Sequence, residues 1–206
     1  MLSTSTATYS GDTAGLLPDY VLMPSAVTEV LMTRVSEVHA AGLKSFGLLV
    51  APSSATNYPY CATDVVFFDP QRNRRNDPHN RTAFEAQGHY FRSYEDAGFV
   101  ADPAEVLQVH RGLEDQGLEP VALFHTHRRQ PANFSHIDFR LHNPAYSWHL
   151  IISLRDPGRP VLRAFMVRKS LDDFGIEPTD SNEHSECDYT GPGVQPLSIR
   201  TASRAA

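Results

Sequence analysis

Short apolar runs recur along the middle of the chain and alternate with segments of helical periodicity. The runs are SFGLLVA at 45–51, ATDVVFFDP at 62–70, PVALFHTH at 120–127, WHLIISL at 148–154 and PVLRAFMV at 160–167. Runs of this length, bounded by Pro, Gly or polar residues, are typical of buried strands. Because strands and helices alternate in a chain of 206 residues, we expect one α/β domain with tails.

Two helices have clear signals. In the first, apolar residues recur near helical spacing from Val27 to Val38, Ser25 is the expected N-cap and Gly42 ends the helix. The second spans 102–117 and has an Asp N-cap, a Pro at its first position, a Glu three residues after the cap and a Gly just past its end.

The two ends of the chain differ in composition from the block between them. Residues 1–21 are rich in Ser, Thr and Gly without a period, and we expect a flexible N-terminal arm. Residues 171–206 hold seven acidic side chains against two basic ones, and we expect a flexible acidic tail. The domain proper is therefore expected at 22–170. With a net charge of -6, the chain lacks the excess of Lys and Arg that nucleic-acid coats need.

Composition also limits the cellular compartment. The chain has two cysteines, Cys61 and Cys187, too few for a disulfide framework or a four-cysteine metal site, and we expect both to be structural or incidental. No apolar run approaches the roughly 20 residues that span a bilayer, and the first residues lack the basic and apolar pattern of a leader. We therefore expect a cytoplasmic protein without a membrane partner.

A polar segment at 71–87 follows the second apolar run. It contains four arginines: Arg72, Arg74, Arg75 and Arg81. We expect an inserted loop here, followed by a strand at 89–96. The arginines are either a solvated surface or, together with Arg128 and Arg129, a basic rim that captures a carboxylate, a phosphate or an acidic carrier protein.

The segment FHTHRRQPANFSHIDF at 124–139 carries the residues best suited to chemistry. His125 and His127 stand at the end of an expected strand, so their side chains leave the same face. Ser135 and Asp138 stand at the expected start of a short helix, on one face of its first turn. Two imidazoles and one carboxylate suit a catalytic zinc ion, which keeps water in its fourth position. Ser135 can donate a hydrogen bond to the oxyanion that forms when a carbonyl is attacked.

A plainer interpretation of these residues exists. Two histidines alone are more often surface or core residues than ligands, and a Ser with an Asp three residues later is a good capped helix start. Capping and catalysis can coexist at one site. Three further histidines lie close by in sequence, and we expect each to face solvent or to form a hydrogen bond without a catalytic part: His136, His142 and His149.

The order His-x-His, seven residues, Ser, two residues, Asp resembles the signature of the JAMM metalloproteases, also called the JAB or MPN+ family. The segment 102–127 looks like the family's helix, turn and metal-bearing strand, and 148–167 resembles its closing pair of strands. The likeness extends over about residues 22–170. The short layout is similar to the stand-alone prokaryotic members of the family.

The resemblance implies a fold, a cofactor and a set of site residues. The fold is an α/β domain with a curved mixed sheet flanked by helices. The cofactor is one zinc ion per chain, or another divalent metal, held by His125, His127 and Asp138. Ser135 is then the catalytic residue beside the metal.

The chain departs from the family at the residue that acts as general base. Active members carry a Glu three residues before a Gly on the first strand, and the matching phrase here runs from Lys44 to Gly47. A charged Lys44 repels a metal ion and cannot accept a proton. Burial and that repulsion both lower the pKa of a lysine, so a neutral amine can serve as base. Arg128 also stands where the family usually has a proline.

Three interpretations of Lys44 remain open. In the first, the chain is an inactive hydrolase that keeps its metal. In the second, it is a working hydrolase whose base is neutral Lys44, the substrate, or a carboxylate such as Glu29 or Glu37. In the third, Lys44 binds a substrate carboxylate or carbonyl, and the fold performs chemistry other than isopeptide cleavage.

The resemblance to stand-alone prokaryotic members implies a zinc-dependent hydrolase that cleaves an amide at the Gly-Gly C-terminus of a ubiquitin-like or sulfur-carrier protein. One alternative is a metal-dependent biosynthetic enzyme acting on a small acidic metabolite, with Lys44 and the arginines as substrate binders. Another is a binding module that retains the metal without turnover. The expected partners are therefore a carrier protein or a small acidic metabolite, and not nucleic acid.

Overall fold

The structure is a computed structural model that describes residues 18–170 and 188–201. The helices are α1 (Ser25–Ala40), α2 (Pro78–Glu85), α3 (His89–Ser93), α4 (Pro103–Asp115) and α5 (His136–Leu141). The strands are β1 (Tyr20–Leu22), β2 (Phe46–Ala51), β3 (Asp64–Phe67), β4 (Glu119–His127), β5 (Trp148–Ser153), β6 (Val161–Val167) and β7 (Val194–Arg200). Two short 3-10 turns, Pro70–Arg72 and Arg74–Asn76, lie between β3 and α2.

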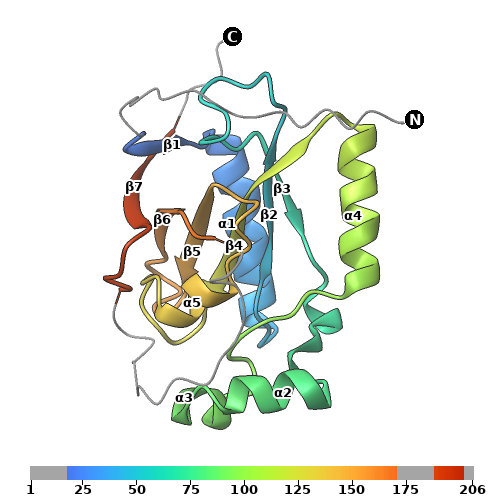
Figure 1. The fold of residues 1–206 in the computed structure, drawn as a ribbon, viewed down its shortest axis with the longest axis vertical. Helices are drawn as coiled ribbons and strands as arrows, with labels where there is room; N and C mark the ends of the chain where they lie inside the picture. The colour runs from blue at the N-terminus through green and yellow to red at the C-terminus, as the bar shows by residue number, and fades with distance from the viewer. Residues whose placement is uncertain (1–17, 171–187, 202–206) are drawn as a thin grey trace, which may run out of the picture.

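The strands form one curved sheet in the order β1-β7-β6-β5-β4-β2-β3 (Figure 1). β4 runs parallel to β5 and β1 runs parallel to β7, while the other neighbours are antiparallel, so the sheet is mixed. Each of the five apolar runs supplies one strand, from β2 to β6. The predicted α/β domain with a mixed sheet is therefore confirmed.

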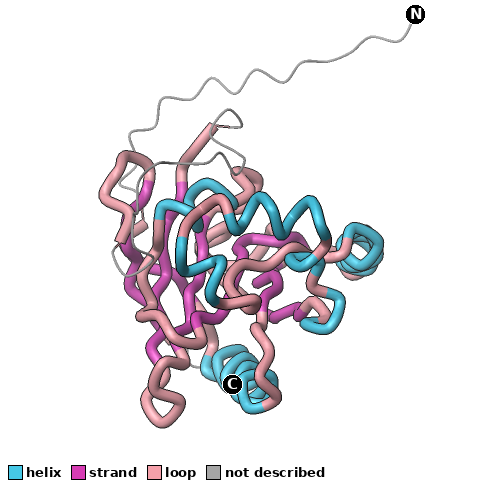
Figure 2. The backbone as a smooth tube through the Cα atoms, turned by 90° about the horizontal axis from the view of Figure 1, so that it is seen from below, coloured by secondary structure: helices cyan, strands magenta, loops and turns pink. Residues whose placement is uncertain are grey.

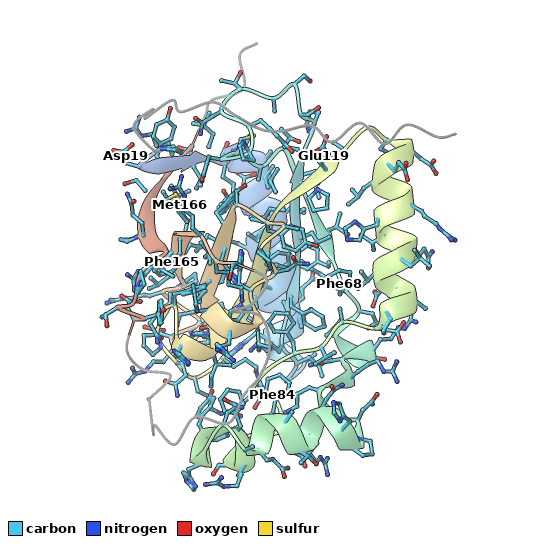
Figure 3. All side chains as sticks on the ribbon, viewed as in Figure 1. Asp19, Phe68, Phe84, Glu119, Phe165 and Met166 are labelled. Atoms are coloured by element: carbon cyan, nitrogen blue, oxygen red, sulfur yellow. The ribbon has the colours of Figure 1, made fainter. Side chains whose placement is uncertain are left out.

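Helices cover both faces of the sheet. Successive side chains of each strand point to opposite sides, so each strand contributes side chains to both layers. α1 packs on one face, against Leu49 of β2 and Met166 of β6. α4 packs on the other face against Phe46, and α5 packs there against Phe165. Figure 2 shows the strands between helices on opposite sides, and Figure 3 labels Phe165 and Met166, neighbours that serve different layers. In the described ranges, no helix is long and apolar enough to cross a membrane.

The two predicted helices form with small differences at their ends. α4 begins as expected, with the Asp102 side chain accepting hydrogen bonds from the backbone N–H groups of Ala104 and Glu105. α1 differs, because its N-cap is Pro24 and no side chain caps it, so the prediction that Ser25 is the cap is wrong. α1 ends before Gly42, whose φ of 80° is the left-handed conformation that stops a helix.

The segment 70–99 is more helical than its sequence suggests. The predicted loop contains α2, and the strand predicted at 89–96 is wrong, because His89–Ser93 forms α3. Phe84 of α2 and Phe91 of α3 stack with their ring centroids 5.6 Å apart and form a small apolar cluster with α5. Tertiary packing of these aromatic rings therefore outweighs the β-propensity of the segment.

The C-terminal segment contributes to the sheet. β7 pairs with β6 on one side and β1 on the other, and Leu197 is buried in the core beside α1. The predicted flexible tail is therefore wrong for residues 188–201. β7 buries one side chain, Leu197, and its pairing with β6 and β1 is not visible in its own sequence pattern. Tyr20–Leu22 likewise joins the sheet, whereas residues 1–17 and 171–187 lie outside the described residues.

Gly47 of β2 is packed so closely that a methyl group does not fit. A Cβ added there lies 2.1 Å from the carbonyl oxygen of Val66 and 2.7 Å from the ring of Phe124. We expect Gly47→Ala to lower the free energy of unfolding by at least about 2 kcal/mol, measured by urea denaturation. Gly112→Ala in α4 is the matched control: its Cβ has nothing within 4 Å, and we expect a gain of up to about 1 kcal/mol. Equal stability of Gly47→Ala and wild type contradicts this packing.

Candidate metal centre

The two histidines of the motif lie at the end of β4, between β2 and β5. Phe46 of β2 and Ile151 of β5 are the register partners of His125. Because side chains alternate along a strand, His125 and His127 point to the same face, the one that α4 and α5 cover. His125 is 1% exposed, so the packed sheet around it holds the ring.

Asp138 approaches the histidines from α5. Ser135 is the N-cap of this helix, and its Oγ accepts a hydrogen bond of 3.2 Å from the backbone N–H of Asp138. In return, Oδ2 of Asp138 accepts hydrogen bonds from the backbone N–H of Ser135 at 2.8 Å and from its hydroxyl at 2.6 Å. This capping box leaves Oδ1 of Asp138 for the histidines. The predicted helix start at Ser135 is confirmed.

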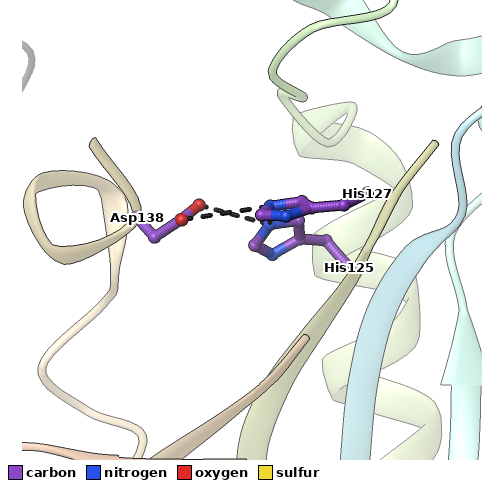
Figure 4. Close-up of side chains that lie close together, drawn as sticks. All are labelled: His125, His127 and Asp138. Atoms are coloured by element: carbon purple, nitrogen blue, oxygen red, sulfur yellow. Dashed lines mark hydrogen bonds and ion pairs between the residues drawn. The ribbon is translucent and has the colours of Figure 1, made fainter. Parts of the chain in front are cut away.

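The three predicted ligands converge. The Nε2 atoms of His125 and His127 are 2.9 Å apart. Oδ1 of Asp138 lies 3.2 Å from Nε2 of His125, and its Oδ2 lies 4.0 Å from Nε2 of His127 (Figure 4). One ligand atom from each residue lies within 4.8 Å of the other two. Such a cluster can hold a metal ion.

The protonation states of these groups suit a bound cation. Nδ1 of His127 faces the carbonyl oxygen of Pro131 at 2.7 Å, and a carbonyl can only accept, so this nitrogen carries the proton. A neutral imidazole has one N–H, which leaves a lone pair on Nε2 of His127. That lone pair faces the other imidazole nitrogen and a carboxylate, and such a group of electron-pair donors is stable around a positive ion. Two imidazoles and one carboxylate match the ligand set of catalytic zinc.

Burial keeps these groups in the protonation states that bind metals. Burial, and after it the neighbouring His125, lower the pKa of His127 to about 3. The pKa of His125 is lowered as well, chiefly by burial. For Asp138 burial alone raises the pKa, but His125 and His127 lower it well below its usual range. At neutral pH both imidazoles are therefore neutral and the carboxylate is ionised, as metal binding requires.

Lys44 lies immediately before β2 and beside β4, the strand of the two candidate histidine ligands. The backbone N–H of Ser45 donates to Oγ1 of Thr126 at 2.9 Å, and the N–H of Thr126 donates to the carbonyl of Ser45, also at 2.9 Å. These bonds place Lys44 in the wall of the pocket that Asp138 also lines. Burial lowers the pKa of Lys44 to about 8, while the charges of Asp138 and Asp96 act in the opposite direction.

The segment 90–99 forms one wall of this pocket. Its lining residues are Tyr90, Phe91, Asp96, Ala97, Gly98 and Phe99. Arg75 holds the wall from behind, where its guanidinium donates to the carbonyl oxygens of Ala97 at 2.9 Å and Phe91 at 2.7 Å. Ile137 and Leu141 of α5 line the pocket as well. The inserted segment therefore shapes the space above the metal centre.

The arginines proposed as a basic rim do not form one. Arg75 is 1% exposed, so the prediction that it binds substrate is wrong. Arg72 forms an ion pair of 2.7 Å with Asp102 at the start of α4, and Arg74 forms one of 2.7 Å with its neighbour Asp77. Arg81 lies 4.0 Å from an exposed glutamate. None of these four arginines is among the residues that line the pocket.

Arg128 and Arg129 are the other two residues of the expected rim, and both bind Asp96. Nη1 of Arg128 lies 2.6 Å from Asp96, and Nη1 of Arg129 lies 2.7 Å from each of its carboxylate oxygens. Burial alone raises the pKa of Asp96, but the hydrogen bonds from both guanidinium groups lower it further than burial raises it. Only Arg128 of the six lines the pocket. The two arginines thus tie segment 90–99 to the end of β4.

The carboxylates considered as substitute bases lie elsewhere. Glu29 and Glu37 are exposed on α1, which covers the opposite face of the sheet. Glu37 pairs with Arg34 at 3.1 Å, and neither glutamate lines the pocket. Both glutamates belong to the helix that precedes Lys44, but this helix packs on the opposite side of the sheet from the candidate metal centre.

Two buried histidines extend the site behind His125. His149 of β5 is 2% exposed and His142, just after α5, is 0% exposed. Of the alternatives expected for them, the structure shows hydrogen bonding in the interior. Burial lowers the pKa of His142 to about 4 and that of His149 well below its usual value. The available sequence signal was a histidine within the apolar run 148–154.

Comparison with known proteins agrees with this geometry. A family model described as prokaryotic homologs of the JAB domain matches residues 55–168. Proteins named CysO-cysteine peptidase from Mycobacterium bovis and Mycobacterium tuberculosis are each 33% identical over 66 residues, which cover 32% of this chain and 45% of theirs. The chain thus matches less than half the length of these curated relatives. A solution structure of a protein from Desulfitobacterium hafniense shares the fold, with a TM-score of 0.57 and 20% identity over 89% of this chain and 94% of that one.

Metal binding tests the centre directly. We expect the chelator-stripped protein to bind one zinc ion per chain, and Asp138→Asn to weaken binding by at least about 100-fold, because a direct ligand matters more than the outer partners whose loss costs 10–100-fold. Competition against a chromophoric chelator measures both affinities. Asp96→Asn is the matched control, since it removes a carboxylate from the same pocket and should leave zinc affinity unchanged. A wild-type protein that binds no zinc refutes the site.

The tie through Asp96 predicts a stability effect. We expect Asp96→Asn to lower the free energy of unfolding by about 1–3 kcal/mol, because two guanidinium groups lose a charged acceptor. Glu37→Gln removes an exposed acceptor and should cost less than about 0.5 kcal/mol. Because the folded-state pKa of Asp96 lies below its ordinary 3.8, its contribution is present above that pH and is lost as the pH falls through the folded pKa. Urea titrations at several pH values measure this, and a gap between wild type and variant that widens in acid contradicts it.

Proposed function

Because this chain belongs to the family of prokaryotic homologs of the JAB domain, we propose that it is a zinc-dependent amide hydrolase. The observation that carries the proposal is the convergence of His125, His127 and Asp138. The proposed scissile bond is the amide at the Gly-Gly C-terminus of a ubiquitin-like or sulfur-carrier protein. The name of the curated relatives, CysO-cysteine peptidase, supports a substrate of this class.

Ser135 has two tasks in the proposed reaction. Zinc held by the three ligands supplies Lewis acidity and lowers the pKa of water to about 7. The Ser135 hydroxyl donates to Oδ2 of Asp138 at 2.6 Å, and rotation about its Cβ–Oγ bond turns the same proton toward a substrate oxygen on which negative charge develops. The backbone N–H of Ser135 continues to hold Asp138 during that rotation.

Lys44 is the proposed general base. The carboxylates among the pocket-lining residues are Asp96, which binds two arginines, and Asp138, which is a ligand. With a pKa of about 8, about a tenth of the Lys44 side chains are neutral at pH 7, and a nearby cation increases that fraction. A neutral amine has a lone pair and can accept a proton from water. We therefore assign Lys44 the role that a glutamate has in the family resemblance.

The shape of the pocket supports a tail without side chains. Aromatic rings of segment 90–99 line the pocket, and the ring centroid of Phe99 lies 5.3 Å from that of His125. A Gly-Gly segment lacks Cβ atoms and passes such walls with the least steric conflict. Bulkier tails fit this proposal poorly.

One observation favours a second candidate, a metal-dependent enzyme that acts on a small acidic metabolite. Among the described residues, no acidic group forms an ion pair with Nζ of Lys44, which lies over the ring of Phe99 at 5.4 Å from its centroid. An unpaired ammonium in a pocket suits a substrate carboxylate. In this candidate Lys44 binds the substrate and stays charged.

Substitution of Lys44 separates the two candidates. We expect zinc-loaded wild type to remove the terminal residue from a carrier protein that ends in Gly-Gly-Cys, with a rate that rises with pH up to about 8 or slightly lower, because only the neutral amine accepts a proton. Lys44→Met should lose at least about 100-fold in rate, because it removes the base. Lys44→Glu should retain cleavage, with the rising limb shifted toward acid. Intact mass spectrometry of the carrier protein measures each rate.

Two outcomes contradict the assignment. Cleavage by Lys44→Glu alone means that the natural chemistry lies elsewhere and favours the acidic metabolite. Equal rates for wild type and Lys44→Met mean that Lys44 is not the base. His110→Leu in α4, away from the pocket, is a control that should leave the rate unchanged.

A further inference from the structure

A row of imidazole rings runs from the metal centre into the interior. His149 is the register partner of Leu123 on β4, so it lies on the same sheet face as His125. The edge of the His149 ring packs against Phe134 at 5.3 Å between centroids, at an angle of 74°. His142 lies behind His149 and is completely buried. Solvent therefore does not reach these two rings.

Each contact in the row joins two ring nitrogens or a nitrogen and a carbonyl. Nδ1 of His125 lies 2.8 Å from Nε2 of His149. Nδ1 of His149 lies 3.0 Å from Nδ1 of His142. Nε2 of His142 lies 2.9 Å from the backbone carbonyl oxygen of Tyr146. All three distances are those of hydrogen bonds.

The carbonyl at the end of the row determines the direction of every bond. A carbonyl only accepts, so Nε2 of His142 carries the proton and its Nδ1 has a lone pair. That lone pair accepts from Nδ1–H of His149, which leaves the lone pair of His149 on Nε2. Nε2 of His149 in turn accepts from Nδ1–H of His125. Nε2 of His125 is therefore unprotonated and faces the metal centre.

This logic requires neutral rings. A doubly protonated His149 has two donors and leaves the Nδ1–H of His125 without its acceptor. Within the described ranges, no carboxylate forms a hydrogen bond or an ion pair with His142 or His149, so a charge on either ring is buried without compensation. The neutral arrangement satisfies every ring nitrogen of both residues.

We propose that His149 and His142 are positioning residues. Their hydrogen bonds connect the Tyr146 carbonyl to Nδ1–H of His125 and keep the Nε2 lone pair of His125 directed at the metal site. The inference rests on the proposed metal site and deepens it. Ligating histidines commonly donate their second N–H to a carboxylate or a carbonyl. Here two neutral rings connect the ligand to a carbonyl, so the ligand is oriented without a second buried charge.

Zinc affinity of matched variants tests the proposal. We expect His149→Leu to raise the Kd for zinc about 10–100-fold, as for other outer partners of metal ligands. His149→Gln should recover most of this loss, because its amide oxygen accepts from His125 and its amide N–H donates to His142. His142→Leu, which does not touch His125, should also weaken binding, because His149 loses the acceptor that fixes its tautomer. His110→Leu should have the affinity of wild type.

A measurement on unmodified protein makes the test independent of variant folding. Nitrogen-15 NMR of histidine side chains in the metal-free wild type should show His125 and His149 protonated on Nδ1 and His142 on Nε2. His125 protonated on Nε2 overturns the proposal, as does equal weakening by His149→Leu and His149→Gln. If wild type itself binds no zinc, the proposed function fails. If wild type and His149→Leu bind zinc equally well, only the positioning role of His149 and His142 fails.

Discussion

The pairing of β2 with β4 is the constraint on which the metal centre depends. Its register sets Phe46 opposite His125, and the hydrogen bonds between Ser45 and Thr126 extend the pairing to the residue before the strand. One strand pair therefore places Lys44 and His127 in the lining of a common pocket, with His125 buried beside them. The absence of a side chain at Gly47 is part of this constraint, because the carbonyl of the next strand approaches it directly. Chemistry at this site is thus a consequence of close backbone packing.

Local capping completes what the sheet begins. A Ser and an Asp three residues later form a reciprocal cap at many helix starts. In α5 the two oxygens of Asp138 have different partners, since Oδ2 accepts hydrogen bonds from Ser135 and Oδ1 faces His125. The same hydrogen bonds that stabilise the helix therefore orient a ligand. Any change that removes the cap should disturb the carboxylate, so stability and metal affinity are coupled at Ser135.

The sequence predicts the parts of this molecule that depend on local pattern. Strands β2 to β6 and helix α4 follow from periodicity and capping residues, and the resemblance to the JAMM signature implies the convergence of His125, His127 and Asp138. The strand β7 and helix α3 do not, because each forms through contacts with segments distant in the chain. The hydrogen bonds of His149 with His125 and His142 were not predicted either, since they depend on side chains that the fold brings together from β4 and from the end of α5. Asp96 was missed for the same reason: its arginine partners lie more than thirty residues away in sequence.

The charge balance of the pocket links the two candidate functions. Of the two carboxylates that line the pocket, Asp96 is bound by arginine and Asp138 is not. The row of imidazole rings behind His125 is neutral. With a divalent ion bound and Lys44 charged, the pocket would have an excess of positive charge, which a glutamate in place of Lys44 would reduce by two units. A substrate with its own carboxylate next to the scissile amide restores the balance, and the last residue of a protein chain provides one. In the proposed function, a charged Lys44 would therefore favour cleavage next to a free C-terminal carboxylate over cleavage at an internal or branched amide.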